Sequence, residues 1–223
     1  GSAGAEKEAE VEQLEQVDRT ATGRETMEIG TCVHWEEGSS VTTENSTDNE
    51  AVDLLGAGRV AAVIIASTSA ARGEAADTTG PILVGWLRSR GYTTPDPIVV
   101  RDGEPVGHAL RSLLVDAGED ERPRIVVTSG GTGLAPDDRT PEFTAELLER
   151  QSPGLIYAMW RKGLEATTSA VMSRGVAGVR GRSFVINFPG SKGGVKDGIT
   201  VIDELLEHIQ TSVEDTTDHG PRV

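Results

Sequence analysis

One continuous apolar stretch of the chain reads Val60-Ala-Ala-Val-Ile-Ile-Ala66. A strand covered by helices on both faces of a sheet has this composition, whereas a strand with one solvated face alternates apolar and polar residues. Three shorter apolar runs follow it, at Ile98–Val100, Ile125–Val127 and Phe184–Ile186. We therefore expect a central strand at residues 60–66, with the other three runs as its neighbours in one sheet.

Amphipathic segments lie between these runs. Apolar residues recur at helical spacing in two stretches, Val106, Ala109, Leu110, Leu113 and Leu114 in the first and Val195, Ile199, Ile202, Leu205, Leu206 and Ile209 in the second. A third helix is predicted to start near Asp77-Thr-Thr-Gly-Pro81, where capping oxygens precede a proline, and to end at Gly91. Strands that alternate with helices are typical of an α/β domain with a mostly parallel sheet.

The two ends of the chain differ from the part between them. Residues 1–57 carry 14 acidic and 3 basic side chains, a net of −11 out of the formal −15 of the whole chain. Their apolar residues are too scattered to build a core, which predicts a disordered acidic arm. Residues 211–223 are polar and are interpreted as a C-terminal tail, so residues 58–210 are expected to form one domain.

Composition also limits the cellular compartment and the classes of binding partner that we expect. A single cysteine, Cys32, can form neither an intrachain disulfide nor a zinc site by itself, which favours a reducing compartment. No apolar run approaches the roughly 20 residues of a membrane span, and the acidic start lacks the pattern of a secretory signal, so we expect a soluble cytoplasmic protein. Strong negative charge disfavours nucleic acid as a partner. The arginines that flank predicted strands are interpreted as a solvated face, namely Arg122, Arg124, Arg180 and Arg182.

A glycine-rich turn follows the third apolar run. It reads Thr128-Ser-Gly-Gly-Thr-Gly133, and its glycines permit positive φ angles and a close approach of backbone N–H groups to a ligand. Ligands of open α/β sheets bind outside the carboxyl ends of the strands, where this turn is predicted to lie. The turn is therefore a candidate phosphate cradle. The alternative is a tight strand-to-helix turn that needs glycine only for steric reasons.

Two aspartates are predicted at the same edge of the sheet. Asp102 follows the Ile98–Val100 run and Arg101, and Asp138 lies shortly after Gly133, ahead of a predicted helix. Mg²⁺ prefers one or two carboxylates together with substrate phosphates, so this pair is a candidate magnesium site. Asp102 can also be an ordinary turn residue, and Asp138 can be a helix N-cap.

A second glycine-containing turn follows the last apolar run. Pro189-Gly-Ser191 leads into Lys192-Gly-Gly194 and the final amphipathic helix. Because a helix N-terminus attracts anions, this turn is a candidate for a second anion site. A purely structural turn is again the alternative.

Familiar nucleotide-binding and hydrolase motifs are missing from the sequence. The glycines are not spaced as in GxxxxGK[ST] or GxGxxG, and Lys192 is followed by glycine rather than by serine or threonine. No GxSxG elbow occurs, and the histidines are spread over predicted tails and helices, which argues against a Ser-His-Asp triad. Two of these histidines, His108 and His208, are interpreted as surface residues of helices.

In combination, the motifs resemble those of the Mog/MoaB family of molybdopterin adenylyltransferases and molybdopterin-binding domains. The resemblance rests on TSGGTG followed by DDRTPE, the DTTG helix entry, Asp102 after the second run, and SRGVAGVRGRSFVINFPGSKGG. It extends from about Arg59 to about Ile209. The resemblance implies a three-layer α/β/α domain, a homo-oligomer (trimer or hexamer), and partners among other molybdenum cofactor biosynthesis proteins.

The resemblance also implies an activity and its residues. The family enzymes use Mg²⁺ and ATP to transfer AMP to the terminal phosphate of molybdopterin, with release of pyrophosphate. Asp102 and Asp138 match the two family aspartates, and are thus the candidate catalytic residues and metal ligands. The N–H groups of Gly130, Gly131 and Thr132 are expected to orient the phosphate. The candidate substrate-binding residues are Thr128, Ser129, Gly130, Gly131, Thr132, Gly133, Thr140, Asp77, Gly80, Pro189, Gly190 and Ser191.

A non-catalytic molybdopterin-binding module of the same fold is the alternative function. Both Asp102 and Asp138 are present, which favours catalysis, because a carrier needs only the glycine turn. The first strand end, Ser67-Thr-Ser69, departs from the family, in which an acidic residue often follows the serine. The acidic arm matches no family motif.

Overall fold

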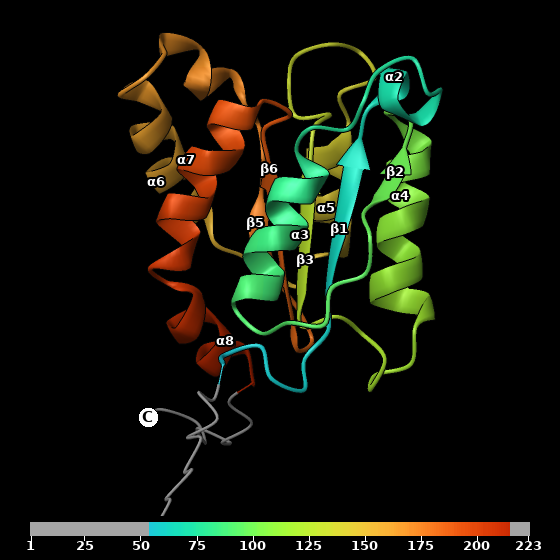
Figure 1. Cartoon of the computed structure of the whole chain (residues 1–223), viewed down its shortest axis with the longest axis vertical. Helices are drawn as coiled ribbons and strands as arrows, with labels where there is room; N and C mark the ends of the chain where they lie inside the picture. Colours follow the sequence, from blue (N-terminus) through green and yellow to red (C-terminus); the bar gives the residue numbers. More distant parts are fainter. Residues whose placement is uncertain (1–53, 215–223) are drawn as a thin grey trace, which may run out of the picture. The chain divides into compact units, whose positions relative to one another are not determined.

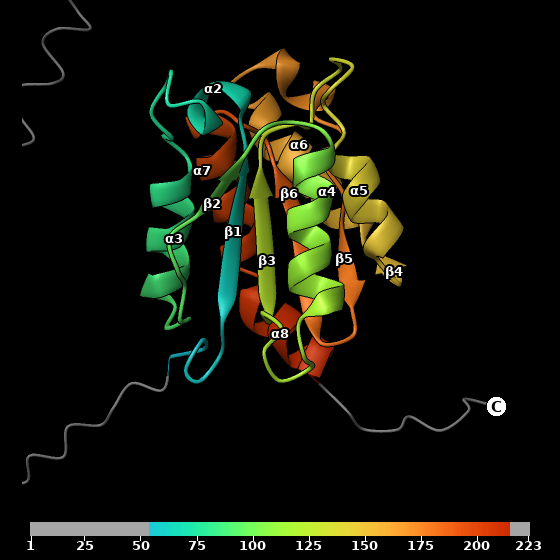
Figure 2. The ribbon, with the colours of Figure 1, turned by 90° about the vertical axis from the view of Figure 1, so that its right-hand side faces the viewer.

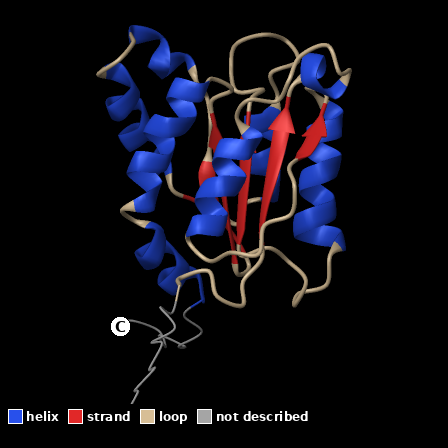
Figure 3. Ribbon diagram, viewed as in Figure 1, coloured by secondary structure: helices blue, strands red, loops and turns tan. Residues whose placement is uncertain are grey.

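A computed structural model of the chain describes residues 54–214 (Figure 1). These residues form a six-stranded, mostly parallel sheet with helices on both of its faces, which confirms the three-layer α/β/α fold (Figure 3). The predicted acidic arm lies outside the described residues up to residue 53, and the predicted tail lies outside them from residue 215 onward.

The four apolar runs form the parallel part of the sheet. They are β1 (Ala61–Ala66), β2 (Ile98–Val100), β3 (Ile125–Ser129) and β6 (Ser183–Phe188), in the order β2-β1-β3-β6. Every residue of β1, β3 and β6 is buried, which explains the apolar run within each of these strands. The prediction that these four runs are neighbours is confirmed.

Two further strands extend the sheet and were not predicted. β5 (Ala177–Arg180) runs antiparallel to β6, and β4 (Arg150–Gln151) runs antiparallel to β5 at the edge. The chain reverses between β5 and β6 at Gly181, whose φ is +52°, a value that glycine adopts without steric cost.

The helices divide between the two faces of the sheet (Figure 2). One face is covered by α3 (Gly80–Ser89), α6 (Pro153–Leu164), α7 (Lys192–Asp203) and α8 (Leu206–Glu214). The other face is covered by α4 (Glu104–Arg111), its continuation η1 (Ser112–Asp116) and α5 (Thr140–Leu147). Two short helices, α2 (Thr68–Ala71) and η2 (Thr168–Met172), complete the described chain. None of the helices in residues 54–214 has both the length and the apolar composition of a membrane span.

The C-terminal helix differs from the prediction. The apolar stripe at residues 195–209 belongs to two helices, because α7 ends at Asp203 and α8 begins at Leu206. Leu205, expected on the buried stripe, is 38 % exposed. α8 continues past residue 210 to Glu214, so the predicted tail starts too early. At the other end of the domain, the amide of Gly56 donates to Arg90 O, so the ordered domain also begins before residue 58.

Three of the four arginines assigned to a solvated face are bound instead to backbone carbonyls or to a carboxylate. Arg180 donates to Leu114 O and Leu147 O, near the ends of η1 and α5. Arg122 donates to Ala117 O and Val115 O. Arg124 pairs with Glu214. Carbonyls at helix C-termini lack partners within the helix, and these cations satisfy several of them. Only Arg182 is exposed as predicted.

We predict opposite effects from two glycine-to-alanine changes in helices. A Cβ at Gly198 of α7 would overlap the ring of Phe188 in β6, whereas a Cβ at exposed Gly85 of α3 would meet open space. Gly198→Ala should lower the free energy of unfolding by about 1–3 kcal/mol. Gly85→Ala should raise it by about 0.5–1 kcal/mol through better helix propensity. Urea unfolding of both variants checks this, and equal effects would contradict the described packing of α7.

We also predict pH-dependent stability from Glu214. Hydrogen bonds from Arg59, 2.7–3.1 Å long, hold the pKa of Glu214 below its usual range, aided by the charges of Arg59 and Arg124. A carboxylate with a depressed folded pKa stabilises the fold above its unfolded pKa of about 4.3, and this contribution is lost as the pH falls through the folded value. Glu214→Gln should therefore cost about 1–2 kcal/mol at pH 7. The difference from the unmutated chain should shrink below about pH 4, as measured by denaturant unfolding. A difference independent of pH would contradict the ion pair.

Candidate functional site

The parallel strands β1, β2, β3 and β6 end at one edge of the sheet, the upper edge in Figure 1. Turns that follow these strands meet there in an open pocket of about 510 Å³, here called the polar pocket. Its wall contains Asp102, Asp138, Gly130–Gly133 and Pro189–Ser191. The predicted convergence of the two carboxylates and the glycine turn on one cavity is therefore present.

Residues Gly130–Gly133 form the glycine loop of this pocket. Gly130 has a φ of +94° and Gly131 a φ of +61°. A Cβ at Gly130 would overlap Ala66 O at the end of β1, and a Cβ at Gly131 would overlap Thr140 Oγ1. Both glycines are therefore required by backbone conformation and by close packing.

The glycine loop offers a different set of N–H donors from the predicted one. The Gly130 amide donates to Phe188 O at 3.2 Å, so it ties β3 to β6 and is not available to an anion, contrary to the prediction. Within residues 54–214, the amides of Gly131, Thr132 and Gly133 make no hydrogen bond. The structure thus favours these three amides as the donors, one residue further along the chain.

Asp102 is oriented by a residue that the sequence reading did not select. Its Oδ2 accepts from the Thr68 amide at 2.9 Å and from Thr68 Oγ1 at 2.8 Å. Thr68 opens α2 directly after β1, so it links the ends of the neighbouring strands β1 and β2. The three consecutive hydroxyl residues at 67–69, directly after a predicted strand, were the feature of the sequence that could have indicated this contact.

Asp138 lies against the glycine loop. A Cβ on Gly133 would come within 2.7 Å of Asp138 Oδ2, and this oxygen accepts from the Ala135 amide at 2.9 Å. The N-cap of α5 is Arg139, and its side chain makes no capping hydrogen bond. Asp138 is therefore not the N-cap, and that alternative is wrong.

Several predicted substrate-binding residues lie behind the pocket rather than in its wall. Thr128 and Ser129 are buried, where Thr128 Oγ1 accepts from Asn187 Nδ2 and Ser129 Oγ donates to Pro189 O. Thr140 is also fully buried, and its amide donates to Gly131 O. Its hydroxyl has no partner within the described residues.

The predicted pair at the start of α3 lies beside the polar pocket. Asp77 Oδ1 accepts from the amides of Thr79 and Gly80, and so it caps the helix. Asp77 also lines a smaller pocket of about 130 Å³, whose wall includes Ser129 and Gly190. Gly80 is buried, and a Cβ there would overlap the Asp77 carboxylate. These contacts give both residues a structural function.

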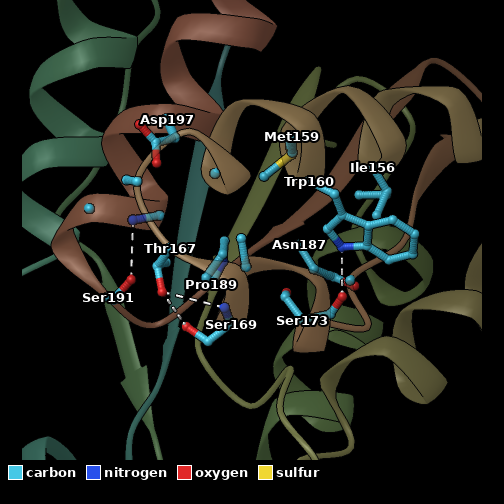
Figure 4. Close-up of a pocket in the computed structure, with 16 residues that line it drawn as sticks. Ile156, Met159, Trp160, Thr167, Ser169, Ser173, Asn187, Pro189, Ser191 and Asp197 are labelled. Atoms are coloured by element: carbon cyan, nitrogen blue, oxygen red, sulfur yellow. Dashed lines mark hydrogen bonds between the residues drawn. The ribbon is translucent and has the colours of Figure 1, made fainter.

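A partly open, mostly apolar pocket of about 200 Å³, here called the apolar pocket, adjoins the polar pocket (Figure 4). Ile156, Met159 and Trp160 of α6 contribute its apolar wall, and α7 contributes Asp197. Four residues line both pockets, namely Ser169, Ser173, Pro189 and Ser191. No helix was predicted at residues 153–164, so this pocket was not expected from the sequence.

Metal ligands are few at this edge. Residues 54–214 contain no cluster of three or more His, Cys, Asp or Glu side chains that could hold a metal by themselves. The polar pocket provides two carboxylates, and a metal held there would need further ligands from water or substrate.

These features define an α/β domain with two adjoining pockets at the carboxyl edge of its sheet. Residues 62–208 match the family model described as "Probable molybdopterin binding domain". The chain belongs to this family.

Individual relatives agree with this assignment. The chain is 34% identical over 164 residues to a molybdenum cofactor biosynthesis bifunctional protein of Synechococcus elongatus, covering 74% of this chain and 50% of the relative. It is 29% identical over 154 residues to molybdopterin adenylyltransferase of Escherichia coli K12, covering 69% and 75%. The molybdopterin biosynthesis Mog protein of Mycobacterium ulcerans matches in structure with a TM-score of 0.64 at 44% identity, covering 70% and 99%. The chain spans half or less of the length of several curated relatives.

We predict that Gly131→Ala disables the glycine loop. An alanine at a φ of +61° is strained, and its Cβ would push against Thr140. Loss of amide bonds to a charged ligand should weaken binding of inorganic phosphate, measured calorimetrically with Mg²⁺ present, by about 10- to 100-fold. Gly154→Ala, where a Cβ would meet open space, is the control and should bind as the unmutated chain does. Equal affinities in the two variants would rule out the loop as the anion site.

Proposed function

We propose that the chain is an enzyme of molybdenum cofactor biosynthesis that transfers AMP from Mg-ATP to the terminal phosphate of molybdopterin. The observation that carries the proposal is the presence of Asp102, Asp138 and the glycine loop in one pocket. A relative named molybdopterin adenylyltransferase, to which the chain is 29% identical, supports this activity. The proposed setting is the cytoplasm, and the proposed form is a homo-oligomer.

The charge of the polar pocket supports a metal requirement. Its wall contains two carboxylates and, among the described residues, no lysine or arginine. Phosphates beside Asp102 and Asp138 would meet like charge unless a cation lay between them. Mg²⁺ fits this donor set, because it takes one or two carboxylates and completes its shell with water and substrate phosphates. When bound, Mg²⁺ would offset the charge of the ATP phosphates and of the departing pyrophosphate.

The remaining residues would bind and orient the two substrates. The amides of Gly131, Thr132 and Gly133 would hold the molybdopterin phosphate. The N-terminus of α7, capped by Ser191, offers a second favourable position for an anion. The apolar pocket would take a planar ring of one substrate between α6 and α7.

The reaction needs no strong base from the protein. An oxygen of the molybdopterin phosphate attacks the α-phosphorus of ATP, and the bond from that phosphorus to the oxygen bridging the β-phosphate breaks. The bonding electron pair leaves on pyrophosphate. Because the attacking phosphate is already anionic at neutral pH, positioning and charge neutralisation are sufficient. The described wall of the pocket accordingly contains no histidine.

A molybdopterin-binding module without catalysis is the second candidate. It is favoured by the description of the family, which names binding and no reaction. The two candidates differ in their need for both carboxylates, so a carboxylate substitution separates them.

We predict that the purified chain releases pyrophosphate when given Mg-ATP and molybdopterin. Asp138→Asn should abolish this release while the circular dichroism spectrum is retained, because the amide removes a metal ligand. Asp137→Asn is the matched control, since Asp137 is exposed and lies outside the pocket wall, and it should retain the activity. Binding of molybdopterin without pyrophosphate release by the unmutated chain would favour the binding module.

A further inference from the structure

A two-residue segment, Ser173–Arg174, connects the loops of the polar pocket. The Arg174 amide donates to Thr132 O at 2.9 Å, and Ser173 Oγ hydrogen-bonds to Thr132 Oγ1 at 3.0 Å. Trp160 Nε1, in the wall of the apolar pocket, donates to Ser173 O at 2.8 Å (Figure 4). The segment therefore touches both pockets, and it holds Thr132 of the glycine loop by main chain and side chain.

The guanidinium of Arg174 binds three acceptors that come from three parts of the chain. Its Nε donates to Gly133 O at 2.8 Å, in the glycine loop. Its two terminal nitrogens donate to the backbone oxygen of Asp138 and to the Glu142 carboxylate at the start of α5. The hydrogen bond from Arg174 also lowers the pKa of Glu142. One side chain thus joins the glycine loop, the Asp138 turn and α5.

This arrangement requires the shape of arginine as well as its charge. The planar guanidinium presents donors in a fixed fork, whereas the lysine ammonium is a compact point charge on a flexible stem. The three donors of a lysine ammonium all leave one nitrogen, so they would not reproduce the spacing of the donors on the guanidinium. Arg174 itself is not in the wall of the polar pocket. It would act on a ligand only through the groups that it holds.

We infer that Arg174 is a positioning residue that fixes the glycine loop relative to Asp138. Asp138 and the free amides of the loop must hold phosphates that react with each other, and they belong to neighbouring turns joined by the exposed stretch 134–137. The Arg174 fork spans this stretch from Gly133 O to Asp138 O. The catalytic consequence rests on the function proposed above, whereas the effect on loop geometry does not.

The test uses the full chain and the variants Arg174→Lys, Arg174→Gln and Arg59→Gln. Arg59 is the matched control, because it also forks between a carboxylate, that of Glu214, and a backbone oxygen, that of Leu55, outside the pocket walls. Hydrogen exchange of peptides covering residues 130–140 reports loop order. Calorimetry with magnesium pyrophosphate reports ligand binding, and pyrophosphate release reports turnover.

We expect faster exchange at residues 130–140 and about tenfold or greater loss of pyrophosphate affinity in both Arg174 variants, lysine included. Turnover should fall by about 10- to 100-fold in both, as is typical of misplaced catalytic groups. Arg59→Gln should leave hydrogen exchange at residues 130–140 and pyrophosphate affinity unchanged, even if it lowers thermal stability as much as the Arg174 variants do.

Three results would overturn the inference. The first is hydrogen exchange at residues 130–140 that is as slow in Arg174→Gln as in the unmutated chain. The second is unchanged pyrophosphate affinity in Arg174→Lys, which would mean that only the charge of Arg174 matters. The third is an equally large increase of loop exchange in Arg59→Gln. Failure of the unmutated chain to release pyrophosphate would instead count against the proposed function. Exchange and pyrophosphate affinity would then still decide the positioning of the loop.

Discussion

The site depends on the close approach of three strand ends around Gly130. With no Cβ, this residue packs against Ala66 O of β1, and its amide donates to Phe188 O of β6. A Cβ on Gly190 would come within 3.2 Å of the Gly130 Cα, so the loop after β6 packs against it as well. A side chain at this point would separate the strands and turn the following amides away from the pocket. The directions of the backbone N–H groups of residues 131–133 therefore depend on the absence of a side chain at Gly130.

Local signals in the sequence predicted most of the fold and part of the site. Unbroken apolar runs identify strands buried on both faces, and contiguous glycines identify the loop, because both signals depend on neighbouring residues. Tertiary contacts decide the remainder. The strands β4 and β5 are short, and the break between α7 and α8 lies within a continuous apolar stripe. No local pattern shows that Arg174 reaches Asp138 or that Thr68 binds Asp102.

The site divides its tasks between backbone and side chains. In the described wall of the polar pocket, positive character comes from backbone amides rather than from lysine or arginine. Such donors are neutral, fixed in direction by the strand ends, and close to two carboxylates. Arginines instead act outside the wall, where Arg174 holds loops and Arg180 satisfies helix carbonyls. This division separates ligand contact from the maintenance of loop geometry.

Arg59 lies just before β1 and pairs with Glu214 at the end of α8, so this ion pair joins the first and last parts of the described domain at the edge of the sheet opposite the polar pocket. The first and last residues that the structure describes therefore lie on the side of the domain away from the polar pocket. Several curated relatives are two or more times longer than the segment they share with this chain. In protein engineering, two ends that lie this close can be joined by a short linker to make circular permutants.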